Sequence, residues 1–167
     1  MKIKQINVER FSVTSLKSFE RVVARFEAAV GHPNMDGFRK DVAAAKAFAE
    51  VESVVNKAIG TSGLMEFTRF DIGEILRKEN GEEAPKILRM VIGNPLIMKH
   101  MVEHVPDAAS YAPVTILIDE RSDGVHLSYD RMSSFLAPYG NVEALKVARE
   151  LDAKIEALLA ETAIGAE

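Results

Sequence analysis

Two histidines four positions apart are the residues of this sequence best spaced to share a metal ion. His100 and His104 lie in a stretch with the apolar periodicity of a helix. On a helix, this spacing brings both imidazoles to one face, where they can bind a divalent metal or haem. A third ligand has to come from elsewhere, with His126 and Glu66 as candidates. The simpler alternative is the edge of an amphipathic helix, where histidines are common without binding anything.

A second group of reactive side chains flanks the open end of an expected β-hairpin. Its members are Tyr111, Tyr129, Asp130, Arg131 and Ser133. Phenol, carboxylate, guanidinium and hydroxyl groups together can bind a polar or anionic small molecule. The plain alternative is a strand end followed by a turn, in which Asp130 and Ser133 accept backbone hydrogen bonds. The Gly-x-Ser-x-Gly motif of serine hydrolases is absent from the sequence.

Three function classes follow from these two groups. The lack of a complete catalytic set favours a binding module, expected to be a homodimer that holds a small, partly apolar molecule. The first alternative is a haem- or metal-binding protein, with a redox role, that uses His100 and His104. The second is an enzyme without a cofactor, whose reacting groups are Tyr111, Asp130 and Arg131. Of these classes, the binding module is the one we expect.

Composition narrows the setting in which such a site operates. The chain has 167 residues, of which 47% are hydrophobic and 28% charged, and this fits a single domain over residues 1–167. The net charge is 21 − 25 = −4, which argues against nucleic acid or an anionic membrane as a partner. The sequence has no cysteine, no signal peptide and no apolar run of 18 residues. We therefore expect a cytoplasmic protein.

The hairpin that should position the second group has the strongest local signal in the chain. Asp123-Gly124 separates two alternating apolar segments, Val114–Glu120 and Val125–Tyr129. A loop of these two residues pairs Ile118 with Tyr129 and Glu120 with Leu127. One hairpin face then carries Val114, Ile116, Ile118, Val125, Leu127 and Tyr129, and the other carries Asp119, Arg121, His126 and Ser128. The first face is expected to lie in the core.

The remaining segments predict the elements around this hairpin. Strands are expected at 3–13, 64–70 and 86–92, and helices at about 18–30, 35–59, 71–80, 94–104 and 141–161. Ser18, Asp71, Asn94 and Asn141 are the expected N-caps. Strands and helices without a repeating βαβ rhythm favour an α+β fold. We expect a largely antiparallel sheet of about five strands with helices packed on one face.

Several short motifs occur in an order that resembles a known family. They are Phe11-Ser-Val-Thr-Ser15, Ser18-Phe-Glu20, Arg69-Phe-Asp-Ile-Gly-Glu-Ile-Leu76, Gly93-Asn-Pro-Leu96, Tyr111-Ala-Pro-Val114, Leu127-Ser-Tyr-Asp-Arg131 and Ser133-Ser134. With this order and spacing, the chain resembles the domain-of-unknown-function family 302. The resemblance implies a small α+β sheet domain, similar to a TATA-binding-protein-like arrangement and often dimeric. It implies no catalytic role.

The chain departs from that family in two places. Many members carry Pro-Cys at the start of the penultimate strand, where this chain has Pro113-Val114. Thiol chemistry is therefore ruled out at this position. Residues 35–60, with their long apolar stripe, are expected to be a helical insertion relative to shorter relatives.

Overall fold

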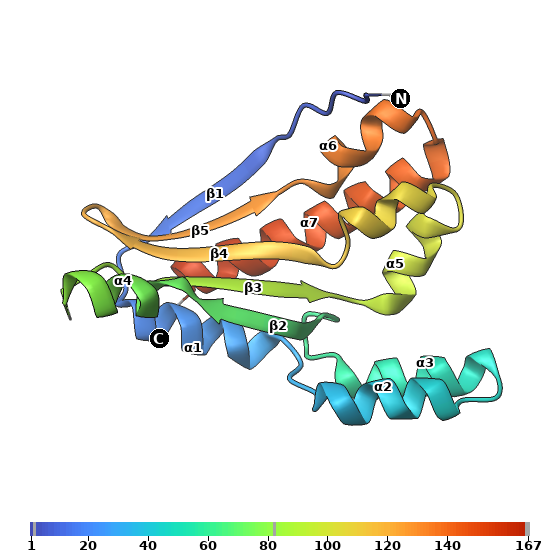
Figure 1. Ribbon diagram of the computed structural model, residues 1–167, viewed down its shortest axis with the longest axis horizontal. Helices are drawn as coiled ribbons and strands as arrows, with labels where there is room; N and C mark the ends of the chain where they lie inside the picture. The colour runs from blue at the N-terminus through green and yellow to red at the C-terminus, as the bar shows by residue number, and fades with distance from the viewer. Residues whose placement is uncertain (2, 82, 166–167) are drawn as a thin grey trace.

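The chain folds into a five-stranded sheet with helices of very different lengths (Figure 1). The computed structural model describes Met1, residues 3–81 and residues 83–165. In chain order, the strands and α-helices are β1 (Arg10–Ser15), α1 (Phe19–Ala29), α2 (Met35–Ala44), α3 (Phe48–Ala58), β2 (Met65–Asp71), α4 (Ile72–Asn80), β3 (Ile87–Gly93), α5 (Pro95–Val102), β4 (Val114–Arg121), β5 (Gly124–Asp130), α6 (Met132–Leu136) and α7 (Val142–Ile164). Two short 3-10 helices, Pro106–Ser110 and Ala137–Tyr139, precede β4 and follow α6.

Most of the longer helices begin where a side chain can satisfy the free N–H groups of the first turn. The caps that accept such a hydrogen bond are Ser18, Asn34, Asp71, Asn94 and Asn141. The four N-caps expected from the sequence are thus confirmed. In α4, the Asp71 carboxylate also accepts a bond from Arg77, which ties the cap to the last turn of the helix.

The sheet is antiparallel throughout, with the strand order β1-β5-β4-β3-β2. Helix α7 contacts β1 and β5, and α1 contacts β4, so both pack on the same face. Figure 1 shows β4 and β5 in front of α7. We call the opposite side of the sheet, which carries Arg10, Leu117 and Ser128, the open face. The expected α+β class, with an antiparallel sheet and helices on one face, is confirmed.

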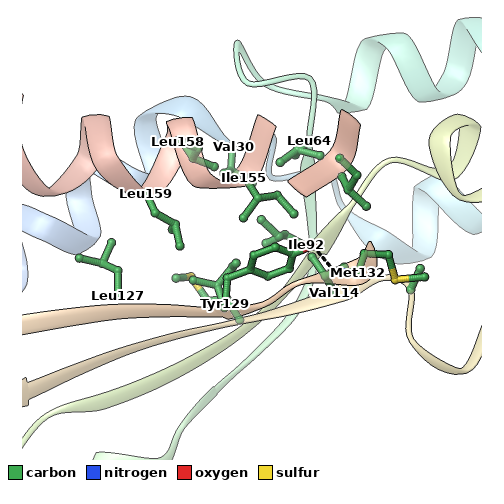
Figure 2. Close-up of a cluster of buried hydrophobic side chains, with 14 of the residues drawn as sticks. Val30, Leu64, Ile92, Val114, Leu127, Tyr129, Met132, Ile155, Leu158 and Leu159 are labelled. Atoms are coloured by element: carbon green, nitrogen blue, oxygen red, sulfur yellow. Dashed lines mark hydrogen bonds between the residues drawn. The ribbon is translucent and has the colours of Figure 1, made fainter. Parts of the chain in front are cut away.

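The core forms because alternate strand residues point toward α7 and α1. Ile116, Ile118 and Leu127 are fully buried on this side and belong to the same core cluster as Ile155 and Leu159 of α7. Figure 2 shows Leu159 opposite Leu127. Burial of such side chains contributes roughly 1.5–3 kcal/mol each. This packing fixes which face of β4 and β5 is left for a ligand.

The hairpin register differs by two residues from the expected one. Ile118 pairs with Leu127 and Glu120 with Val125, so the expected pairs of Ile118 with Tyr129 and Glu120 with Leu127 are wrong. The turn is 122–123, because Gly124 belongs to β5 with a φ of 137°. A Cβ on Gly124 would lie 2.6 Å from the Ser15 carbonyl oxygen of β1. A shift of two keeps every side chain on its expected face.

The first strand is shorter than expected and starts later. It spans Arg10–Ser15, whereas a strand over 3–13 was expected. Its neighbour β5 ends at Asp130, directly opposite Arg10, and one further backbone bond joins Arg131 N–H to the Glu9 carbonyl. The strand therefore begins where its hydrogen-bonding partner ends.

The expected helix over 35–59 is two helices, α2 and α3, that lie side by side in Figure 1. Ala45 and Ala47 have extended backbone conformations, so the helix breaks without glycine or proline. The Glu50 carboxylate accepts a bond of 2.9 Å from the Lys46 backbone N–H at this break. We call residues 35–58 the helical arm. Its status as an insertion relative to shorter relatives stays a prediction.

None of the helices in the described part of the chain combines the length and the apolar character needed to cross a membrane.

Candidate functional site

An ion pair lies at the end of the open face where β1 begins and β5 ends. Arg10 is directly opposite Asp130 in the sheet register. Its Nε lies 2.6 Å from Asp130 Oδ1 and its Nη2 lies 2.9 Å from Oδ2. Such two-point guanidinium–carboxylate contacts are among the stronger hydrogen bonds in proteins. The bonds and the charge of Asp130 raise the pKa of Arg10, which stays protonated.

Aromatic rings form a wall beside this pair. Tyr111, which directly follows the first 3-10 helix, stacks on Phe135 of α6, with ring centroids 4.8 Å apart and an angle of 14° between the ring planes. The Tyr111 hydroxyl lies 2.9 Å from that of Tyr139, and this bond is the main cause that raises the pKa of the Tyr139 phenol. Each ring is therefore held by a neighbour. The wall is pre-organised rather than free to rotate.

A cavity of about 300 Å³ opens between the ion pair and the aromatic wall. We call it the sheet cavity. Leu117 of β4 provides its apolar floor, and Thr115 and Ser128 add hydroxyls. Ser128 is hydrogen-bonded to Ser12 at 3.2 Å, whereas Thr115 receives a long contact of 3.5 Å from Arg89. The site thus combines an apolar surface with a few placed polar groups, as small-molecule sites commonly do.

Tyr129 borders this cavity but directs its ring away from it. The ring lies in the core beneath α7, as Figure 2 shows, and the phenol donates to Asp152 at 2.7 Å. Burial is the main cause that raises the pKa of Tyr129, and the nearby Asp152 charge adds to it. The backbone N–H groups of Met132 and Ser133 also donate to Asp152, at 2.7 and 3.2 Å. Tyr129 therefore anchors the start of α6 and offers no free hydroxyl to a ligand.

Arg131 and Ser133 line a different hollow, of about 400 Å³, between α6 and α7. Arg131 Nε lies 2.6 Å from Glu156 Oε1, and its Nη1 lies 3.2 Å from Glu9 Oε2. These bonds raise the pKa of Arg131. The five residues expected to form one ligand site are therefore divided. Tyr111 and Asp130 line the sheet cavity, Tyr129 has its ring in the core, and Arg131 and Ser133 line the hollow on the helix side.

His100 and His104 are exposed on and just after α5, and both approach the same carboxylate. His100 Nδ1 lies 3.0 Å and His104 Nε2 lies 3.9 Å from Glu103 Oε1. The bond from His100, and then that from Lys99, holds the pKa of Glu103 at about 2. Across the described residues, no cluster of three or more side chains has the arrangement of a metal site.

The two candidate third ligands have partners elsewhere. His126 Nε2 lies 2.8 Å from Asp123 Oδ1 on the open face. Glu66 accepts bonds of 2.6 Å from Nε and Nη2 of Arg69. Neither side chain is therefore free to complete a site with the α5 histidines.

Comparison with known proteins places this fold in a family. The model of the family "Domain of unknown function DUF302" matches residues 38–162. The chain belongs to the DUF302 family. Its fold is similar to the crystal structure of an uncharacterized conserved DUF302 protein from Bacillus stearothermophilus, with a TM-score of 0.65 and 8% identity. That likeness covers 93% of this chain and 98% of the other and concerns the fold alone. No curated protein sequence matches the chain.

Two residues important to this DUF302 protein were missed by reasoning from the sequence. Arg10 lies 120 positions before its partner Asp130, so no local pattern joins them. Asp152 did carry a signal, because it lies four residues after Ala148 and three before Ile155, on the buried stripe of α7. A carboxylate at such a position is rarely buried without hydrogen-bond partners.

Proposed function

We propose that this DUF302 protein binds a small molecule in the sheet cavity. The observation that carries the proposal is the cavity itself, with a fixed aromatic wall on one side and the Arg10–Asp130 pair on the other. Its volume of about 300 Å³ is at the lower end for ligand pockets, which suits a compound of one or two rings. Recognition by shape, with few polar contacts, is what such a lining provides.

A binding role agrees better with the geometry than the enzyme alternative. That alternative requires Tyr111, Asp130 and Arg131 in one constellation, but Arg131 is held by Glu156 on the helix side. The Tyr111 hydroxyl is paired with that of Tyr139, and Asp130 with Arg10. None of these groups is poised beside a base or nucleophile in the manner of a catalytic pair.

Filling the cavity tests the proposal. We expect a fragment library to shift the backbone amide resonances of Thr115, Leu117 and Ser128 in the labelled full chain. Leu117→Trp places a larger ring on the cavity floor and should weaken binding at least tenfold, because the ligand loses its space. Nuclear magnetic resonance titrations measure both effects.

A matched control keeps this test specific. Ile87 is another half-buried aliphatic residue of the open face, in β3, and it does not line the cavity. Ile87→Trp should therefore leave the fragment affinities unchanged, and thermal melting checks that both variants fold. Two outcomes would contradict the proposal. In one, a fragment shifts these resonances as much in Leu117→Trp as in the natural chain; in the other, no fragment shifts them at all.

The α5 histidines support a second candidate, the binding of one divalent metal ion. The observation in its favour is that both imidazoles approach the same Glu103 oxygen, so that two nitrogen ligands lie near each other. Calorimetric titration with Zn²⁺ is expected to show one site that His100→Ala weakens at least tenfold. His32→Ala is the control, because His32 is exposed and far from His100 and His104 in the sequence. An unchanged isotherm for His100→Ala ends this candidate, and a haem at this site would instead show as visible absorbance.

The expected homodimer is a further part of the proposal. Native mass spectrometry of protein purified from its host reports the number of chains and any retained small molecule in one spectrum. A monomer without a ligand would contradict both expectations for the purified protein.

A further inference from the structure

The Arg10–Asp130 pair keeps hydrogen-bonding capacity toward the sheet cavity. Arg10 has five N–H donors and uses two of them for Asp130. Each Asp130 oxygen accepts one of those bonds and retains a second lone pair. The pair therefore presents unused donors directly beside unused acceptors.

The same pair makes the cavity close to neutral. Among the described residues that line it, Arg10 and Asp130 are the charged ones, and their charges cancel. A bound anion would lie beside the Asp130 carboxylate, and a bound cation beside the Arg10 guanidinium. Among the described lining residues, neither ion would find a counter-charge that is not already paired, which disfavours both. Arg89 is not itself a lining residue; its Nη2 donates to Thr115 Oγ1 at 3.5 Å, and its guanidinium lies 5.7 Å from the Phe70 ring.

The apolar part of the lining selects for shape. The Tyr111 and Phe135 rings are nearly parallel in their stack, and Leu117 lines the same cavity. A flat ring fits between such surfaces and gains stacking contacts without a charge. Two lining hydroxyls have partners within the protein: that of Ser128 is bonded to Ser12, and that of Thr115 accepts a long contact from Arg89. Neither therefore requires a hydrogen bond from the ligand.

We propose that the ligand is a neutral, planar nitrogen heterocycle with a hydrogen-bond donor next to an acceptor. This inference rests on the proposed function. A lactam is the simplest group of this kind. Its N–H faces a free lone pair of Asp130, and its carbonyl oxygen faces a free N–H of Arg10. The ring lies against Leu117 and the Tyr111–Phe135 wall.

A set of four probes of similar size tests this class in the full chain. Pyridone in its lactam form has both groups, and N-methylpyridone has the same shape without the donor. Benzoate is a planar anion and benzamidine a planar cation. We expect pyridone to bind at least tenfold more tightly than the other three, because each of them leaves a polar group of the pair unmatched. Amide resonance shifts of Thr115 and Ser128 report the affinities.

A variant that removes one charge of the pair should change the affinities for benzoate and pyridone in opposite directions. Asp130→Asn leaves Arg10 without its counter-charge, so benzoate should bind more tightly to the variant than to the natural chain and pyridone less tightly. The Ile87→Trp variant is the control and should change neither affinity. Equal binding of pyridone and N-methylpyridone, or a preference of the natural chain for benzoate, overturns the assignment of the ligand class.

This failure is distinct from failure of the proposed function. If library fragments shift the cavity resonances but lactams do not, the cavity binds a different class of molecule. If no compound shifts them, both the class and the function are wrong.

Discussion

Replacing Asp152 by alanine is expected to lower the free energy of unfolding by about 3–5 kcal/mol. The carboxylate is buried and accepts bonds from the Tyr129 phenol and from the N–H groups of Met132 and Ser133. Its removal leaves buried donors without a partner, and each such donor costs about 1–3 kcal/mol. Urea denaturation followed by circular dichroism measures the change.

Two control variants distinguish the loss of this hydrogen-bond network from the effect of any substitution in α7. Glu150→Ala changes an exposed carboxylate of the same helix and should cost less than about 0.5 kcal/mol. Tyr129→Phe removes one donor, so the double variant with Asp152→Ala should be less destabilised than the sum of the two single variants. A stability of Asp152→Ala close to that of the natural chain would show that the network does not hold α6.

Gly31→Ala is expected to cost more than about 2 kcal/mol, because the backbone leaves no room for a side chain. A Cβ at Gly31 would lie 1.9 Å from the Ala58 carbonyl oxygen and 2.8 Å from the Gly60 nitrogen. Both Gly31 and Gly60 donate to the same Leu64 carbonyl, so neither segment can move aside without losing a bond. Thermal and urea unfolding measure the loss.

Gly37→Ala is the matched control for this substitution. Its Cβ would come no closer than 3.4 Å to the nearest atom, the Asn34 Oδ1, and alanine favours a helix. We therefore expect this variant to be as stable as the natural chain, or more stable by up to about 1 kcal/mol. Equal stability of the two variants would refute the steric explanation. The contact of Gly31 with Gly60 also closes the helical arm at its base.

The candidate site was only partly predictable, and its residues show why. The alternation of apolar and polar residues along β4 and β5 correctly predicted that Leu127 points into the core and Ser128 toward the open face. It did not predict the ion pair of Asp130 with Arg10, because β1 and β5 lie side by side only in the folded sheet. It also grouped Arg131 with Asp130, although the chain turns after the strand and sends Arg131 toward Glu156.

The sequence by itself determined the features that depend on residues a few positions apart. Asp71 and Asn141 cap their helices through N–H groups three residues on, and hairpin faces follow from alternation. Only the tertiary structure decided the hairpin register, the break between α2 and α3, and the lining of the sheet cavity. For the register and the cavity, the physical reason is that they depend on contacts between distant segments, such as Gly124 with Ser15 and Arg10 with Asp130. Such contacts exist only once the strands and helices have packed together.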